Sequence, residues 1–258
     1  MKPFVRNIII AVLLTAIVVT FHIVRRNSTM RGIEISISDG CKNNLLDDGE
    51  IENLILGHYP GLEQTDIKEV DTKGIVELLS GNPYVLTAKA HRSMGGKLQV
   101  SVTLRDPVVR MFYQDNEFYI SRQGTYMPLT ASHYSHVIVG SCGFEEPHCR
   151  NIHLLNLSDT SLHKQPFTLR KIWTLASFLY DNPQYGDIFD QISVEDKGDL
   201  FLVPKLGNLT VIVGDTSQLD KKFENMWAFL DQGINQVGWD TYSTINLKFN
   251  NQVVCSRK

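Results

Sequence analysis

Hydrophobic and polar residues follow short, regular patterns through most of the chain after an apolar amino-terminal run. Residues 33–38 (IEISIS) place an apolar side chain at every second position, which predicts a half-buried strand. Residues 84–92 and 97–105 repeat this period of two. The Gly95-Gly96 pair between them predicts that these two strands form a hairpin.

Two helical segments separate the first strand from this hairpin. Asp47 and Glu50 have the spacing of a capping box, so we expect Asp47 to cap a helix that continues through residues 51–57. Asp71-Thr72 marks the start of a second helix, which ends near Gly81. The resulting order, β-α-α-β-β, predicts a compact unit of roughly 75 residues, a size that can fold alone.

The pattern changes after Pro107. Two strands are expected to pair as a hairpin around Asp115-Asn116, and Gln123-Gly124-Thr125 predicts a further turn. Residues 141–166 are polar and lack a clear period, which is typical of a loop. The remaining strands are predicted at residues 136–140, 190–195, 199–205, 209–214, 242–249 and 252–255.

Two amphipathic helices interrupt these strands. The first covers residues 167–181 and is stopped by Asn182-Pro183; its apolar stripe consists of Leu169, Ile172, Trp173, Ala176, Leu179 and Tyr180. The second covers residues 217–232, and Gly233 is predicted as its left-handed cap. Its predicted buried face consists of Leu219, Phe223, Met226, Trp227 and Leu230. The sequence thus predicts an α+β protein whose second half is a mixed β domain with two flanking helices.

Arg105, Asp106 and Pro107 separate the two patterns. Proline fixes φ and has no N–H to donate to a sheet, so a strand ends where it occurs. We therefore expect a domain seam at these three residues, with one domain at residues 33–106 and the other at residues 107–258.

Residues 8–24 contain no charged side chain. As a helix they would be ~26 Å long at ~1.5 Å per residue, close to the ~30 Å hydrocarbon core of a bilayer. A cleaved signal peptide is the alternative, with Lys2 and Arg6 as its basic region, but no small-residue cleavage site follows. The sequence favours a transmembrane helix between a tail of residues 1–7 and a linker of residues 25–32. Basic residues on both sides leave its orientation open.

The charge of the chain excludes one class of partner. It carries 25 basic and 28 acidic residues, for a formal net charge of -3, so no strongly basic face for nucleic acid is expected.

No G-x-S-x-G elbow, P-loop or H-E-x-x-H motif is present. We therefore predict a non-enzymatic protein with no catalytic residues, no cofactor and no small-molecule substrate.

The four cysteines are sparse. Cys142 and Cys149 are close enough in sequence to bridge a short loop in an oxidising compartment. Together with His148 and His153 they could also be read as a zinc site. That spacing matches none of the usual zinc patterns, so a polar loop is preferred and no metal is predicted.

Four stretches of the chain carry a family resemblance. Residues 75–109 contain a Pro83-Tyr84-Val85 turn before a closing hairpin, and residues 118–129 contain a hairpin with a turn at Gly124. Residues 214–230 contain Gly214 followed by most of the second predicted helix. Residues 242–249 end in Asn246, Leu247, Lys248 and Phe249. In this order after a single apolar run, the chain resembles the FtsQ/DivIB family of bacterial cell-division proteins, which tends to have Asp-Leu-Arg-aromatic at the last four positions.

This resemblance implies a fold and a location. Residues 33–106 would form a POTRA domain and residues 107–258 the carboxy-terminal β domain. Residues 1–7 would be a short cytoplasmic tail, residues 8–24 a single transmembrane helix in the inner membrane, and the domains would lie in the periplasm at the division septum. The resemblance also implies a non-catalytic scaffold that recruits an FtsB/FtsL-like pair and, through it, the septal wall synthases.

A partner site is implied at the carboxy-terminal end. A chain that ends in a strand leaves a sheet edge, which is either an ordinary guarded edge or an acceptor for a partner's strand. The residues alone leave both interpretations open, and the resemblance favours partner binding. The positions that it implies are Lys248, Phe249, Asn251, Gln252, Val253 and Val254.

Two other functions remain as alternatives. The first is a POTRA-containing factor in outer-membrane protein assembly or secretion. The second is a membrane-anchored periplasmic hydrolase, which would need a convergent catalytic cluster that the sequence does not show.

Overall fold

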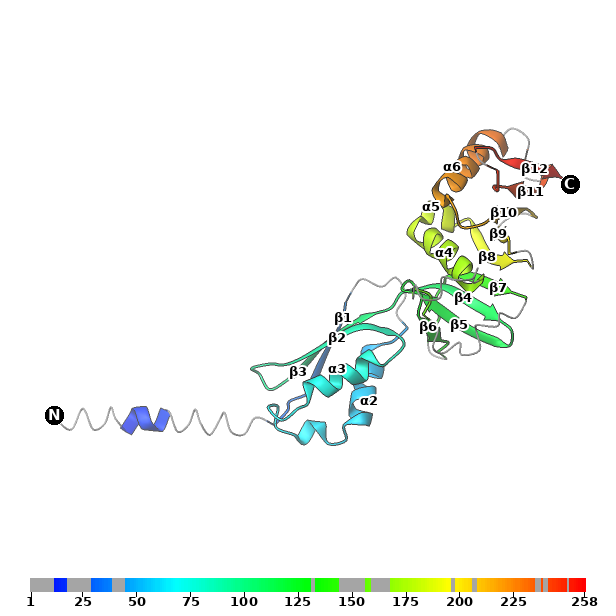
Figure 1. Ribbon diagram of the computed structural model, residues 1–258. Coiled ribbons are helices and arrows are strands. Elements are labelled where there is room, and N and C mark those ends of the chain that lie inside the picture. Colours follow the sequence, from blue (N-terminus) through cyan, green and yellow to red (C-terminus); the bar gives the residue numbers. More distant parts are fainter. Residues whose placement is uncertain are drawn as a thin grey trace. The chain divides into compact units, whose positions relative to one another are not determined.

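The structure, a computed structural model, divides the chain into two compact units (Figure 1). The first comprises Met1–Gly40 and Leu46–Leu104, and the second comprises Cys41–Leu45 and Arg105–Lys258. Each unit is described by itself. The structure describes residues 12–17, 29–38, 45–130, 133–143, 156–158, 168–195, 198–205, 208–234, 238, 241–249 and 251–258.

The amino-terminal run is described only at residues 12–17, which are helical and exposed. Among the residues that the structure describes, no helix combines the length and the apolar composition that crossing a membrane requires. The rest of the predicted transmembrane helix at residues 8–24 lies outside the described residues, so that helix stays a prediction.

The first unit has the predicted β-α-α-β-β order. Its elements are β1 (Ile33–Ile37), α2 (Asp48–His58), a 3₁₀ turn (Leu62–Gln64), α3 (Thr72–Ser80), β2 (Val85–Arg92) and β3 (Leu98–Leu104). The predicted capping box of α2 is present, because Glu50 N–H donates to Asp47 Oδ1 at 2.7 Å and Asp47 N–H donates to Glu50 Oε2 at 3.1 Å. Asp71 caps α3 by accepting a hydrogen bond from Gly74 N–H at 3.0 Å.

The sheet of this unit has the order β1-β3-β2. The central strand β3 runs parallel to β1 and antiparallel to β2. Alternate residues of β3 are buried, whereas the intervening side chains are partly exposed. Helix α3 contacts β2, and α2 contacts both β1 and α3, so the helices bury one face of the sheet. The buried positions are Leu98, Val100, Val102 and Leu104 of β3 with Ile51, Ile55, Ile75 and Leu79 of the helices.

The second unit is built on one large sheet. Its strands are β4 (Pro107–Tyr113), β5 (Asn116–Ser121), β6 (Tyr126–Pro128), β7 (Ile138–Cys142), β8 (Phe189–Val194), β9 (Leu200–Pro204), β10 (Thr210–Gly214), β11 (Tyr242–Asn246) and β12 (Val254–Arg257). Its helices are α4 (Thr168–Asp181), α5 (Pro183–Gly186) and α6 (Leu219–Phe229), which continues into a π-helical turn (Leu230–Ile234). The predicted α+β class is confirmed.

The nine strands follow the order β12-β11-β10-β9-β8-β7-β4-β5-β6. Strands β7 and β8 are parallel because α4 and α5 connect them, and β10 and β11 are parallel because α6 connects them. The sequence-adjacent pairs β4–β5, β8–β9 and β11–β12 are antiparallel. The three helices lie along one side of the sheet (Figure 1).

The core of the second unit fills the space between these helices and the sheet. Phe223 of α6 is fully buried, and its ring lies 5.1 Å from that of Phe178, 5.4 Å from that of Tyr185 and 6.3 Å from that of Phe189. This aromatic cluster joins α4, α5, α6 and β8 into one layer. Nearer the start of α4, Trp173 Nε1 donates to the carbonyl oxygen of Ser121 at 3.0 Å and so attaches the helix to the end of β5.

Several predicted positions in this unit are wrong. Trp227 is 47% exposed, because the buried face of α6 runs through Leu219, Phe223 and Met226 and leaves Trp227 beside it. Gly233 lies inside the π-helical turn, so it is not a left-handed cap. Strand β7 starts two residues later than predicted, since its pairing with β4 begins at Ile138, and it includes residues 141–142 that were predicted as loop.

The predicted loop at residues 141–166 is described only at residues 141–143 and 156–158. Cys142 is buried at the end of β7. Cys149, His148 and His153 lie outside the described residues, so the predictions of a bridge or a metal there are not tested.

Candidate protein-interaction edge

Strand β12 is the outermost strand of the nine-stranded sheet. It pairs antiparallel with β11, from Tyr242 opposite Arg257 to Asn246 opposite Val254. No described strand pairs with its other side. This strand was predicted at residues 252–255, and it begins two residues later, at Val254. An outermost strand presents backbone N–H and C=O groups that can accept another strand.

The side chains of this last segment divide between two environments. Val253 and Cys255 pack partly against the hydrophobic core, and partial burial raises the pKa of the Cys255 thiol. Val254, between them, is 42% exposed. The alternation fixes the register of β12, because a shift by one residue would expose Cys255 and bury a polar neighbour.

The connection from β11 to β12 is anchored at its start. Leu247 is buried, and its N–H donates to the carbonyl oxygen of Ile212 at 2.8 Å. Lys248 N–H donates to Oδ1 of Asn246 at 3.0 Å, which turns the chain out of the strand. The next residue, Phe249, is 46% exposed. Asn251 adopts a left-handed conformation with φ of 57°, which an asparagine tolerates better than most residues.

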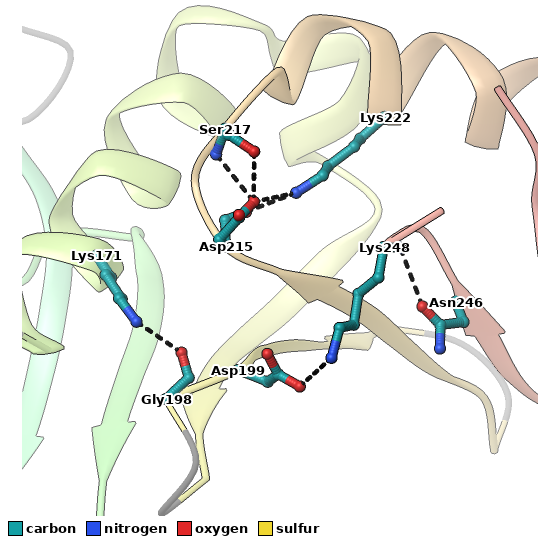
Figure 2. Close-up of polar contacts among 8 residues, drawn as sticks. All are labelled: Lys171, Gly198, Asp199, Asp215, Ser217, Lys222, Asn246 and Lys248. Carbon is teal, nitrogen blue, oxygen red and sulfur yellow. Dashed lines mark hydrogen bonds and ion pairs between the residues drawn. The ribbon is translucent and has the colours of Figure 1, made fainter. Parts of the chain in front are cut away.

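The side chain of Lys248 is held by an ion pair at its tip, drawn in Figure 2, and by packing of its stem. Its Nζ lies 2.6 Å from Oδ2 of Asp199, which precedes β9. Its aliphatic stem covers Gly214, where a Cβ atom would lie 2.6 Å from Lys248 Cγ. Gly214 has a φ of 77°, so its backbone also requires glycine. The lysine thus joins the β11–β12 connection to the ends of β9 and β10.

A second lysine makes a similar contact at the start of α6. Lys222 Nζ lies 2.6 Å from Asp215 Oδ1, which also accepts hydrogen bonds from the hydroxyl and the N–H of Ser217 (Figure 2). The hydrogen bond from Lys222, followed by that from the Ser217 hydroxyl, lowers the pKa of Asp215 to about 2. Because Gln218 adopts a left-handed conformation at the N-cap of α6, this network supplies the side-chain contact that the cap itself lacks.

Two further contacts of charged side chains in the second unit involve neither β11 nor β12. Arg110 Nη2 lies 2.6 Å from Glu117 Oε2, and this hydrogen bond raises the pKa of Arg110. Lys171 donates through Nζ to the carbonyl oxygen of Gly198 at 2.9 Å, which fastens α4 to the β8–β9 turn (Figure 2). The first contact joins β4 to β5 within the sheet, and the second attaches the helix layer to the sheet.

The three residues predicted as a domain seam all lie at the start of the second unit. Arg105 donates to Oγ1 of Thr125 at 3.4 Å, and partial burial lowers the pKa of its guanidinium group. The carbonyl oxygen of Asp106 accepts a hydrogen bond from Arg122 N–H at 2.8 Å. Pro107 is buried and is the first residue of β4, a position where a missing N–H is tolerated.

The structure brings the six predicted partner-binding positions into one segment at the sheet edge. Phe249, Gln252 and Val254 are exposed, as is Asn251 at its turn, whereas Val253 is half-buried and Lys248 is in an ion pair. Sequence analysis missed Asp199, which lies 49 residues away from Lys248. It also missed Asp215, although the Asp-x-Ser pattern before a helix was a readable signal for a local turn.

The architecture defines a class of protein: a small β-α-α-β-β unit followed by a mixed β domain whose last strand pairs, among the described strands, on one side only. Residues 28–103 match a POTRA-like domain, and residues 106–256 match the family described as FtsQ/DivIB, C-terminal related. The second match covers more than half of the 258 residues, and the chain belongs to this FtsQ/DivIB-related family of cell-division proteins. Membership was predicted from the sequence and is confirmed. No curated protein matches the chain.

Proposed function

We propose that the protein is a non-catalytic scaffold of the bacterial division machinery. In this proposal residues 8–24 anchor it in the inner membrane, and the POTRA-like unit and the β domain lie in the periplasm at the septum. The β domain binds an FtsB/FtsL-like pair and, through it, retains the septal wall synthases. Family membership supports a role in cell division, and the remaining statements are the proposal.

The single observation that carries the proposed partner site is the outer side of β12. This strand is the last of the sheet and pairs with β11 alone among the described strands. A partner segment in extended conformation would add a tenth strand there, with main-chain hydrogen bonds supplying affinity and side chains supplying specificity. Phe249 and Val254 offer apolar contacts beside the new strand, because 46% and 42% of their surfaces are exposed.

The ion pair of Lys248 supports this arrangement. By holding the start of the β11–β12 connection against Gly214 and Asp199, it limits the conformations of the segment that carries Phe249. A binding segment that is ordered before the partner arrives loses less entropy on association. Lys248 therefore acts as a positioning residue in the proposed site.

The proposed anchor would raise the fraction of weakly binding partners that are bound. A protein confined to the membrane plane meets other anchored proteins at a high effective concentration. The POTRA-like unit would supply further protein contacts under the same confinement.

The first test is depletion of the protein in cells, followed by measurement of cell length and of outer-membrane protein levels. Long filaments without septa and normal outer-membrane proteins are expected. Normal division with depleted outer-membrane proteins would refute the division scaffold. It would favour the second candidate, a factor in outer-membrane protein assembly or secretion, for which the POTRA-like match is the supporting observation.

The second test addresses the partner site. Phe249→Lys should weaken binding of the FtsB/FtsL-like pair, measured by co-purification of the full chain from membranes, and should leave folding unchanged. Trp227→Lys is the matched control, because Trp227 is an equally exposed aromatic residue but lies on α6. Unchanged binding by a folded Phe249→Lys variant, or equal losses in both variants, would rule out this edge as the site.

A further inference from the structure

A cavity of about 460 Å³ lies beside the helix layer of the second unit, away from the edge of β12. It is bounded by the start of β7, the start of β8, the end of α4 and the short helix α5. Strands β4, β7 and β8 are mutually parallel across their pairings, so their first residues meet at one end of the sheet. Strand β9 runs antiparallel and contributes its last residues there.

Two backbone contacts fix the walls of this cavity. Gly186 packs against the end of α4 so closely that a Cβ atom there would lie 2.5 Å from the carbonyl oxygen of Leu179. Lys205 N–H donates to the carbonyl oxygen of Ile188 at 2.8 Å and so joins the end of β9 to the start of β8. Both contacts involve main-chain atoms, which move little, so the walls of the cavity are held in fixed positions.

The lining has an apolar interior and a charged rim. Buried side chains of Val108, Leu179 and Phe189 form part of its wall. The exposed carboxylates of Asp187 and Asp190 also line it. In the described part of the chain neither carboxylate takes part in an ion pair. Among the described residues of the lining Lys205 is the one lysine or arginine, so these residues carry an excess of negative charge at neutral pH.

We propose that this cavity binds a basic segment of a partner protein. An apolar side chain of the segment occupies the cavity, and flanking Lys or Arg side chains contact Asp187 and Asp190. A volume in this range accommodates a large side chain against an apolar wall, and opposite charge at the rim sets the orientation. Lys205 also lines the cavity and repels basic side chains, so the Lys or Arg flanks of the segment are expected on the side of Asp187 and Asp190.

This second site is independent of the partner site proposed for β12. Strands β10 and β11 lie between β9, which borders the cavity, and β12. One partner can therefore occupy the cavity while another occupies the sheet edge, which is what a scaffold requires.

The test uses the purified full chain in detergent micelles and three blocked peptides that share a central phenylalanine. Its neighbours are lysines in the first peptide, glutamates in the second and serines in the third. Methyl NMR signals of Val108, Val137, Ile138 and Leu179 report occupation of the cavity. Only the lysine peptide should shift these signals with high affinity, and its binding should weaken in 0.5 M salt because exposed charge pairs are screened.

Variants separate the rim charges from a general charge effect. Asp187→Asn combined with Asp190→Asn should weaken binding of the lysine peptide about tenfold, since each exposed ionic contact contributes modestly. Asp220→Asn, which removes an exposed carboxylate on α6, should leave binding unchanged. Lys205→Glu should strengthen binding.

The proposal is wrong if the glutamate peptide binds as well as the lysine peptide, or if the paired Asn substitutions leave binding unchanged in a folded protein. It is also wrong if the shifted signals lie outside the cavity. Phe249→Lys must leave peptide binding unaltered, so this test and that of the β12 edge can fail separately.

Discussion

Strands β4, β7 and β8 in the middle of the nine-stranded sheet are covered by α4, whereas β12 at its end has one neighbour among the described strands. In the middle, side chains and main chain approach so closely that Gly140 has no room for a Cβ atom. At the end, Phe249 and Val254 are more than two fifths exposed. The same sheet therefore contains a part with no tolerance for added volume and a part with free apolar surface.

This difference predicts that residues under the helix layer determine stability and that exposed residues near β12 determine partner binding. Substitutions under the helix layer should change the free energy of unfolding, whereas substitutions of exposed side chains near β12 should change binding with little effect on folding. The comparison would fail if an exposed side chain near β12, such as Phe249 or Val254, proved as costly to replace as one in the core. Four substitutions test it, in order of decreasing effect.

Phe223→Ala should have the largest effect on stability. The side chain is fully buried among Phe178, Tyr185 and Phe189, and removing it leaves a cavity between α6 and β8. We expect a loss of about 3–5 kcal/mol in the free energy of unfolding, measured by urea denaturation. Trp227→Ala on the same helix is the control and should cost about 1 kcal/mol, since Trp227 is half exposed and meets the Tyr185 ring edge-on. Equal losses would contradict the assignment of the buried face of α6.

Gly140→Val should be the next most harmful change. A Cβ atom at this position would lie 2.5 Å from Met111 Sδ and 2.8 Å from Ile172 Cγ2, so α4 would have to move away from β7. Overpacking of this kind costs about 1–3 kcal/mol. Gly143→Val is the matched control, because no atom of the described residues lies within 4 Å of the corresponding Cβ position. A thermal unfolding midpoint that is equally lowered in both variants would show that α4 does not limit this site.

Features that depend on residues of a single helix could be predicted from the sequence. The stripe of α4 and the residues Leu219, Phe223 and Met226 of α6 could be predicted, because helical period alone places them on one face. Capping at Asp47 and Asp71 could be predicted as well, since it depends on residues three positions apart.

Contacts between distant segments could not be predicted in this way. Nothing in the sequence near Lys248 indicates Asp199, and nothing near Gly140 indicates Ile172, because these pairs meet only once the strand order is known. The exposure of Trp227 was mispredicted for the same reason. Its place on the helix is at the border of the buried face, and the width of that face depends on the neighbours that cover it.

Gly214→Ala tests how tightly the β11–β12 connection is held. Its positive φ alone makes alanine unfavourable by about 1–2 kcal/mol, and the new Cβ atom would also lie 2.6 Å from Lys248 Cγ. Lys248→Ala removes that contact but leaves the backbone strain. In a double-mutant cycle, the two changes together should therefore destabilise the protein by less than the sum of the single changes. Additive effects would mean that the Lys248 stem does not lie over Gly214.

Asp215→Asn should have the smallest effect, and its signature is a dependence on pH. The pKa of Asp215 is about 2 in the folded protein, below the ordinary value of 3.8, so the charged carboxylate is favoured by folding. Its contribution is complete above about pH 4 and is lost as the pH falls toward 2.

The stability difference between wild type and Asp215→Asn should therefore be constant near neutral pH and shrink below pH 4, measured by urea denaturation across this range. Because Asp215 is largely exposed, the difference should stay below about 1 kcal/mol. A difference that persists unchanged at pH 2 would mean that Lys222 and Ser217 do not stabilise the charged form of Asp215, and the start of α6 would then owe its position to packing alone.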